Sequence, residues 1–311
     1  MKIVFFGTPD FAVASLEAIN QSNHEIVGVV TSVDKPAGRG KKLQSSSVKK
    51  YAEEHNLLLH QPENLKDESF ISSLSQLEAD LFVVVAFRMM PKIVWSMPKM
   101  GTFNLHASLL PQYRGAAPIN WAIINGESYT GVTTFLIDDK IDTGNILMYE
   151  KAEINPNDNA GTLHDKLMLL GKDLVLKTID NLQNNSLEPR KQITDGIELK
   201  LAPKLTKANT KIDWNESGNV IVNKIKGLSP YPSSWCKIQF AEKTLNFKLF
   251  DASLSDLKIP VGHLIIKGKN CYVGTNSNAI KLLEVQVEGK KRTSSIDFIN
   301  GHKQFENITL S

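Results

Sequence analysis

The residue types best suited to chemistry stand close together in the segment GTFNLHASLLPQYRGAAPINW, residues 101–121. Asn104 and His106 lie two positions apart at the end of a predicted strand, so both side chains project from the same face. Phe103 and Leu105 then pack on the opposite face. The carboxyl ends of strands line the ligand crevice of open α/β sheets. An amide and an imidazole there can hold a carbonyl oxygen and accept or supply a proton; a purely structural histidine is the alternative.

The elements that position these residues follow a pattern of short apolar runs alternating with helix-like segments over residues 1–185. This alternation is typical of a βαβ sheet. We predict helices over 12–20, 46–55 and 162–184, and strands over 2–6, 25–31, 81–87, 101–105, 132–137 and 146–150. The run LFVVVAF is apolar throughout, as expected of a strand that is covered on both faces. The predicted fold class is α/β, with a Rossmann-like, mostly parallel sheet.

The first turn of this sheet excludes one class of ligand. Gly7-Thr8-Pro9-Asp10 follows the first predicted strand, where a dinucleotide-binding protein carries G-x-G-x-x-G. Only one glycine is present, and Pro9 removes a backbone donor from the position of the phosphate cradle. We therefore expect neither a nicotinamide nor a flavin dinucleotide.

The remainder of the chain has a different pattern. Turn residues break the periodicity after residue 185 and predict a linker over 186–204. One helix is predicted over 217–227, followed by strands over 235–240, 244–249, 264–267, 271–273 and 280–286. Short strands at this spacing favour a small β-barrel of the oligonucleotide-binding type. The predicted domains are thus a catalytic domain over 1–185 and a barrel over 205–311.

The charges divide unequally between the two parts of the chain. Residues 201–311 hold 16 Lys and Arg against 9 Asp and Glu, whereas residues 1–200 hold 20 against 24. A basic smaller part joined to an acidic larger part indicates that the smaller part meets a polyanion. Lysines that serve only solubility are the alternative interpretation.

Composition narrows the class of protein further. The longest apolar runs are far shorter than the roughly 18 residues of a membrane span. No secretory leader is evident, and Cys236 and Cys271 are too few for a disulfide framework or a zinc site. We expect a cytoplasmic protein with no metal, no membrane association and no obligate protein partner.

Further motifs stand around the Asn104 and His106 pair. Ser108-Leu109-Leu110-Pro111 leaves the strand, and Asp142-Thr143-Gly144 follows the next predicted strand, 132–137. Together these segments resemble the folate-dependent formyltransferases, whose hallmark is N-x-H-x-S-L-L-P followed downstream by D-T-G. The resemblance covers nearly the whole chain and is closest to the members that act on methionyl-tRNA. It rests on FFGTPDFA, PAGRGKKL, SLLPQYRGAAPI, IDTGNIL, GTLHDKL, KIDW, SPYPSSW and EGKK.

The resemblance implies that Asn104, His106 and Asp142 form a catalytic trio. It implies transfer of the formyl group of 10-formyltetrahydrofolate to the α-amino group of initiator methionyl-tRNA. Asn104 would donate to the developing oxyanion. Two assignments of the base stay open: His106 itself, or Asp142 acting through a water while His106 and Asn104 hold the oxygen. We favour the second. Without the resemblance, Asp-Thr-Gly reads as turn chemistry.

The resemblance also implies binding residues. The folate co-substrate would contact Ser108, Leu109, Leu110 and Pro111. The basic loop over 34–43 would meet the tRNA acceptor stem through Arg39, Lys41 and Lys42. Lys204 and Lys207, aided by 290–292, would contact phosphates from the second domain. A solvated basic loop and a Pro-terminated strand exit are the structural alternatives.

One stretch departs from the pattern of the family. This chain has Phe87-Arg88-Met89-Met90-Pro91 where many relatives have small residues, so these side chains either reshape the pterin pocket or pack beneath it. Two other functions stay open: a folate-dependent formyltransferase of a small amine, such as an amino sugar nucleotide, and a catalytically silent RNA-binding module. A glycinamide ribonucleotide enzyme is disfavoured because Ala107 stands where that family has Pro.

Overall fold

The computed structural model describes residues 1–37, 42–240, 243–301 and 308–311. The chain forms two compact units. The first comprises Met1–Gly115, Thr130–Glu153 and His164–Leu201, and the second comprises Ala116–Tyr129, Ile154–Leu163 and Ala202–Ser311. The second unit therefore includes two short segments that lie within the first 185 residues of the sequence.

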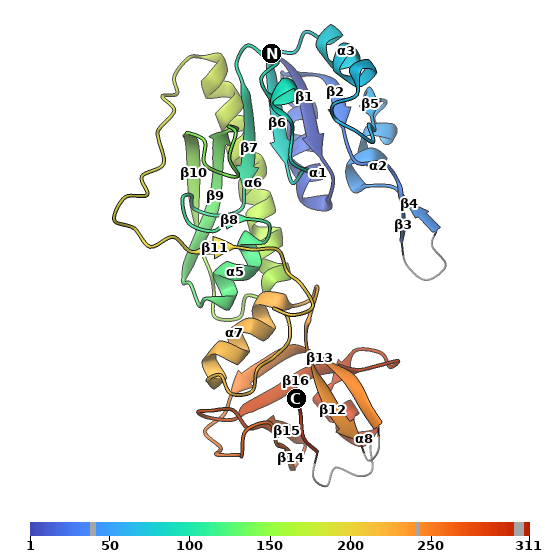
Figure 1. The fold of residues 1–311 in the computed structure, drawn as a ribbon, viewed down its shortest axis with the longest axis vertical. Coiled ribbons are helices and arrows are strands. Elements are labelled where there is room, and N and C mark those ends of the chain that lie inside the picture. The colour runs from blue at the N-terminus through green and yellow to red at the C-terminus, as the bar shows by residue number, and fades with distance from the viewer. Residues whose placement is uncertain (38–41, 241–242, 302–307) are drawn as a thin grey trace. The chain divides into compact units, whose positions relative to one another are not determined.

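The first unit is built on a seven-stranded sheet of order β10-β9-β7-β6-β1-β2-β5 (Figure 1). Neighbours from β7 to β5 are parallel, whereas β9 runs antiparallel to β7. The mostly parallel, Rossmann-like sheet is confirmed. Its strands are β1 (Lys2–Gly7), β2 (Glu25–Val30), β5 (Leu59–His60), β6 (Leu81–Val85), β7 (Thr102–His106), β9 (Tyr129–Leu136) and β10 (Ile146–Glu153).

Helices cover both faces of this sheet. Val4 and Phe6 pack with Phe70 and Leu74 of α3, so alternation turns the intervening Phe5 to the other face, and all three β1 side chains are fully buried. This two-sided burial is the reason that the central strands are apolar throughout. The helices of the first unit are α1 (Asp10–Asn20), α2 (Ser47–Glu54), α3 (Glu68–Gln76) and α4 (Lys92–Trp95), together with most of α6 (Ala160–Gln183).

The packing of α6 against β7 fixes which face of β7 is free for chemistry. A Cβ on Gly171 of α6 would lie 2.7 Å from Cδ2 of Leu105, so the glycine allows the helix to approach the strand closely. Leu105 and Phe103 are buried, at 4% and 0% exposure. Asn104 and His106 alternate with them and project from the opposite face.

The segment predicted as a linker packs along the first unit as far as Leu201. Ile146 and Arg190 form an antiparallel bridge with two backbone hydrogen bonds of 2.8 Å. Further along, the Tyr113 backbone N–H donates to the Lys200 carbonyl at 2.6 Å. The short strand β11 (Leu201–Ala202) then pairs with β8 (Arg114–Gly115). This segment therefore lies beside the chain that leaves β7.

The second unit contains an antiparallel sheet of order β12-β13-β16-β15-β14, with β17 beside β16. Residues 308–311 bridge its two ends, because Leu310 pairs with Ile238 of β12 and Thr309 pairs with His263 next to β14. The described strands thus close into a barrel. Its elements are β12 (Ser234–Phe240), β13 (Lys243–Leu254), β14 (Leu264–Lys267), β15 (Asn270–Val273), β16 (Ile280–Val287), β17 (Thr293–Ser294) and α8 (Ser295–Asn300), preceded by α5 (Pro118–Ile124) and α7 (Gly218–Leu228).

Closure of the barrel gives a stability prediction. Leu310 is 4% exposed within the barrel core, whereas its neighbour Thr309 is exposed. Leu310→Ala should lower the free energy of unfolding by about 2–5 kcal/mol, because it leaves a cavity at the seam. Thr309→Ala, the matched control, should change it by no more than about 0.5 kcal/mol. Urea unfolding measures both. Equal effects of the two substitutions would contradict the role of Leu310 in the seam.

Candidate active site

Asn104 and His106 lie within the last three residues of β7, which pairs with β9. Asn104 lies opposite Phe135 and His106 opposite Thr133. The Asn104 side chain is half-buried and makes no hydrogen bond to any described residue. Its amide is therefore a donor and acceptor available to a ligand.

The His106 ring is held in one orientation. Its Nε2 lies 2.8 Å from the Tyr113 carbonyl oxygen, and because a carbonyl only accepts, Nε2 carries the hydrogen. Nδ1 then faces Oδ2 of Asp142 at 3.8 Å. The His106 side chain is 7% exposed and the Asp142 side chain 14%. In the neutral ring Nδ1 is consequently the atom that accepts a proton.

Asp142 reaches this position from the turn between β9 and β10. Its backbone is left-handed, with φ of 54°, and its Oδ2 accepts a hydrogen bond from the Gly115 N–H at 2.8 Å. Thr143 ties the turn to Asp138 through a 2.8 Å hydrogen bond from its Oγ1. Gly144 is required here, since a Cβ would lie 1.6 Å from the Leu136 carbonyl oxygen. The Asp-Thr-Gly motif thus combines a carboxylate, a tether and a close backbone approach.

The geometry separates Asp142 from the neighbouring acid Asp139. The Asp139 side chain is 69% exposed, and its Oδ2 lies 3.5 Å from Nζ of the equally exposed Lys92. A solvent-exposed pair of this kind contributes little. The nearly buried Asp142 carboxylate, in contrast, lies 3.8 Å from Nδ1 of His106. The structure brings together His106 and Asp142, two members of the predicted trio, and Asn104 shares the strand face of His106.

The predicted folate-contacting stretch turns sharply after β7. Ser108 is fully buried, and its hydroxyl donates to the Gln112 carbonyl at 2.7 Å. The Leu110 N–H donates to Thr133 at 3.2 Å. Leu109 and Pro111 are half-buried, and Leu109 packs closely on Gly131 of β9. Leu109 and Pro111 are therefore the members of this stretch with surface to offer a ligand, while the Ser108 hydroxyl holds the turn.

The unusual stretch after β6 divides its roles. Arg88 donates from Nη1 to the Glu63 carbonyl at 2.8 Å and from Nη2 to the Pro62 carbonyl at 2.5 Å. Met90 is 8% exposed in the apolar cluster around Phe6, whereas Met89 is 75% exposed. Of the two interpretations left open by the sequence, packing beneath the surface fits Met90, and Met89 projects into solvent.

The basic loop falls partly outside the described residues. Arg39 and Lys41 are not among them, and Lys42 begins β4 (Lys42–Gln44), which pairs with β3 (Lys35–Ala37) as a hairpin (Figure 1). The base of this hairpin is tied at Asp34, which accepts hydrogen bonds from Lys49 at 2.8 Å and Gln61 at 3.1 Å. These bonds hold the pKa of the Asp34 carboxyl below its usual value.

The predicted RNA-contacting lysines of the second unit are exposed. Nζ of Lys207 lies 5.4 Å from the centre of the Trp235 ring, and the Trp235 indole N–H donates to the Lys207 carbonyl at 3.0 Å. A hollow of ≈ 350 Å³ lies beside them, and Lys248 and Asn246 also line it. Arg292, by contrast, is paired with Glu284. Lys204 and Lys207 have no ion-pair partner among the described residues, so both ammonium groups can meet an anion.

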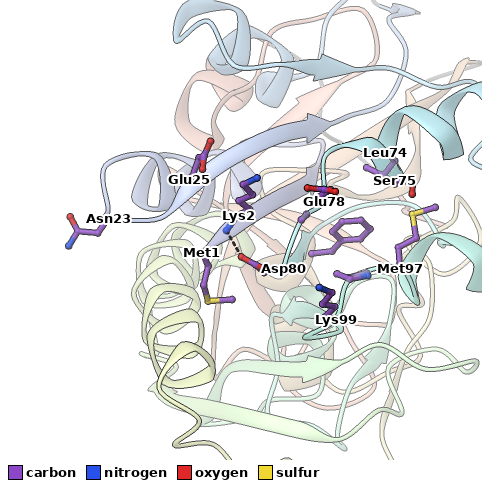
Figure 2. A pocket seen from close by; sticks show the side chains of 13 residues that line it. Met1, Lys2, Asn23, Glu25, Leu74, Ser75, Glu78, Asp80, Met97 and Lys99 are labelled. Atoms are coloured by element: carbon purple, nitrogen blue, oxygen red, sulfur yellow. Dashed lines mark hydrogen bonds between the residues drawn. The ribbon is translucent and has the colours of Figure 1, made fainter.

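A larger cavity of ≈ 770 Å³ lies at the other edge of the sheet (Figure 2). Its lining includes Lys2, Glu25 and Asp80, which lie at or before the first residues of β1, β2 and β6. The Lys2 N–H donates to Asp80 at 2.8 Å across its wall (Figure 2). Ligands of open α/β sheets bind at the carboxyl ends of strands, so this cavity is not the candidate site.

Two features are absent from the described part of the chain. It contains no helix that is long and apolar enough to cross a membrane. It also contains no group of three or more His, Cys, Asp or Glu side chains arranged to hold a metal ion.

Sequence reasoning missed the residues that hold the trio in place. Tyr113 and Gly115 act through their backbone atoms, which no side-chain pattern reveals. Gln192 donates to the carbonyls of Asp142 and Gly144, although it stands in a segment predicted to be a linker. The local signal is the Tyr-Arg-Gly run within SLLPQYRGAAPI, which does not reveal that its backbone atoms hold the two side chains.

The chain is similar to known proteins along both units. The formyl transferase family matches residues 1–179, and the C-terminal domain of formyl transferases matches residues 204–303. The chain is 51% identical over 303 residues to the methionyl-tRNA formyltransferase of Flavobacterium johnsoniae, covering 97% of this chain and 96% of the relative. The similarity therefore extends across both units.

Solved structures show the same fold at lower identity. An N-formyltransferase from Helicobacter canadensis, in complex with folinic acid and dTDP-3-aminofucose, matches with a TM-score of 0.64 at 23% identity, over 91% of this chain and 98% of that one. HypX from Aquifex aeolicus, in complex with tetrahydrofolic acid, matches with a TM-score of 0.64 at 18% identity. The match spans 96% of this chain but only 47% of HypX. By the family matches and the full-length similarity together, the chain belongs to the formyl transferase family.

Proposed function

We propose that this chain transfers the formyl group of 10-formyltetrahydrofolate to the α-amino group of initiator methionyl-tRNA, in the cytoplasm. The observation that supports it best is the identity of about one half to a methionyl-tRNA formyltransferase along both units, together with Asn104, His106 and Asp142 on one site. The amide, imidazole and carboxylate are the groups that acyl transfer to an amine requires.

The reaction assigns a task to each of the three side chains. The amine nitrogen attacks the formyl carbon, and the carbonyl oxygen becomes negative. The Asn104 amide, which bonds to no described residue, can donate an N–H to this oxyanion. The bond from carbon to N10 of the folate then breaks, and a proton passes from the attacking amine to N10. Nδ1 of His106 and the Asp142 carboxylate face each other at 3.8 Å, so they can take and return that proton.

In this proposal the basic second unit binds the RNA. Residues 201–311 carry the excess of Lys and Arg, and Lys207, Lys248 and the Trp235 ring surround one hollow. Ammonium groups position phosphates without reading sequence, and an indole offers a surface for a base. A barrel with such a face is suited to hold the tRNA while the first unit performs the chemistry.

The substrate assay separates the candidate functions. Purified enzyme receives labelled 10-formyltetrahydrofolate with methionyl-tRNA, uncharged tRNA or a dTDP-amino sugar. We expect label on the methionyl amine only. Label on the sugar would favour the small-amine function, for which the fold shared with the Helicobacter canadensis enzyme is the supporting observation. Binding of tRNA with no transfer to any amine would favour a silent RNA-binding module.

Loss of either the Asn104 or the His106 side chain should remove most of the catalytic activity. Asn104→Ala and His106→Ala should each lower kcat by about 10²–10⁴, because an oxyanion donor and a proton-transfer group each contribute about that factor. Affinity for methionyl-tRNA and the thermal midpoint should stay near the wild-type values. Single-turnover formylation measures the rate, and near-normal transfer by either variant would remove its assigned role.

The two nearby acids should differ sharply. Asp142→Asn keeps the shape and tolerates a left-handed backbone, but it loses the charge next to His106, so kcat should fall by about 10²–10⁴. Asp139→Asn is the matched control, since its exposed side chain pairs with exposed Lys92, and its kcat should stay within about threefold. A larger loss for Asp139→Asn would show that the acid is wrongly assigned.

The lysines should act through salt-dependent contacts. Binding of tRNA weakens with salt by about 0.7–0.9 log units per log unit of salt for each phosphate neutralised. Lys204→Ala with Lys207→Ala should lower that slope by up to about two contacts. The Lys267→Ala, Lys269→Ala double variant loses the same charge from the exposed β14–β15 turn of the second unit. Its salt slope should remain steeper than that of the Lys204→Ala, Lys207→Ala variant. Equal slopes for the two double variants would contradict a specific role for Lys204 and Lys207.

A further inference from the structure

We propose that Gln192 is a positioning residue of the formyl transfer reaction, which sets the Asp142 carboxylate against His106. The inference rests on the proposed function and concerns a residue that touches neither substrate. Gln192 stands in the segment that continues from α6 toward the second unit, 50 positions beyond Asp142 in the chain. It is 6% exposed, which is unusual for an uncharged polar side chain in such a segment.

Every strong hydrogen-bonding position of the Gln192 amide has a partner. Its Nε2 donates to the carbonyls of Asp142, at 2.9 Å, and Gly144, at 2.8 Å. Its Oε1 accepts from Nε of Arg114 at 3.1 Å and from Nη2 of Arg114 at 2.6 Å. Because carbonyls only accept and a guanidinium only donates, the orientation of the amide is unambiguous. A buried amide satisfied on both sides holds its neighbours rigidly.

The two partners of Gln192 are the two loops that build the site. One loop carries Asp142 and Gly144, and its left-handed Asp142 backbone has to be held by surrounding contacts. The other carries Arg114, directly between the Tyr113 carbonyl that holds His106 and the Gly115 N–H that holds Asp142. One amide therefore joins the loop that orients the histidine to the loop that supplies the acid.

The backbone of Gln192 is itself fixed. Two residues earlier, Arg190 exchanges two backbone hydrogen bonds of 2.8 Å with Ile146, the first residue of β10. Asp142 lies just before that strand. The backbone next to Gln192 is thus held by β10, the strand that follows the turn carrying Asp142. Loss of the amide should let the turn shift while the sheet remains, and a misplacement of about 1 Å can cost about 10² in rate.

The experiment uses the full chain with two alternative substitutions of Gln192. Gln192→Met keeps the length and removes all four hydrogen bonds. Gln192→Glu keeps an oxygen for Arg114 but removes both donors to the Asp142 turn. We expect kcat for methionyl-tRNA to fall by about 10–100-fold in both, with both KM values within about threefold.

A mutant cycle with Asp142→Asn distinguishes positioning from loss of structure. If Gln192 acts through Asp142, Gln192→Met should cause little further loss of kcat in the Asp142→Asn background. The matched control is Gln112→Met, which breaks bonds to Glu198 and Lys200 on the same segment without touching the turn. Gln112→Met should lower the thermal midpoint, and its small effect on kcat should be additive with Asp142→Asn.

The outcomes separate this inference from the proposed function. A wild-type enzyme that does not formylate methionyl-tRNA would contradict the proposed function itself. A wild-type enzyme that does, beside a folded Gln192→Met or Gln192→Glu variant of normal kcat, would overturn only the role of Gln192. Additivity of Gln192→Met with Asp142→Asn would overturn it as well. Near-complete loss of additivity, absent for Gln112→Met, would support it.

Discussion

The approach of the Asp142 carboxylate to Nδ1 of His106 is the interaction on which the rest of the first unit depends. The histidine comes from a central parallel strand, and the acid comes from a turn after a strand of opposite direction. Bringing them together requires a left-handed backbone at Asp142 and at Tyr113. Such conformations persist only where surrounding contacts over-determine them. The close approach at Gly144 and the hydrogen bonds of Gly115, Thr143 and Gln192 supply those contacts.

This arrangement explains why the strand pair was visible in the sequence and its supports were not. Period-two alternation places Asn104 and His106 on one face, and the apolar runs of the central strands announce their burial on both faces. The mostly parallel sheet was predictable for the same reason. Asp142 carried no signal of its own, because Asp-Thr-Gly is equally good turn chemistry, and only the family resemblance singled it out.

The supports escaped prediction because they act at long range through backbone atoms. Gln192 pairs with carbonyls 48 and 50 positions away, and nothing local in PRKQI distinguishes it from a solvated glutamine. Gly144 has the same character, since its need to lack a Cβ comes from the Leu136 carbonyl across the turn. In the second unit, the short strands and turns favoured a barrel. Its closure by residues 308–311, which lie too close to the chain end to form a strand pattern, was visible only in the structure.

The orientation of the His106 ring connects the fold to the chemistry, because it decides which nitrogen meets Asp142. Nitrogen-15 NMR of the histidine-labelled enzyme tests it directly, with the resonances of His106 assigned by the His106→Ala variant. The account predicts that, in the neutral ring, Nε2 carries the hydrogen and Nδ1 is unprotonated. Replacement of Asp142 by Asn should shift the Nδ1 resonance and leave Nε2 protonated. A neutral ring protonated on Nδ1 would contradict the account, because the Tyr113 carbonyl would then face a bare nitrogen and the pair with Asp142 would be differently built.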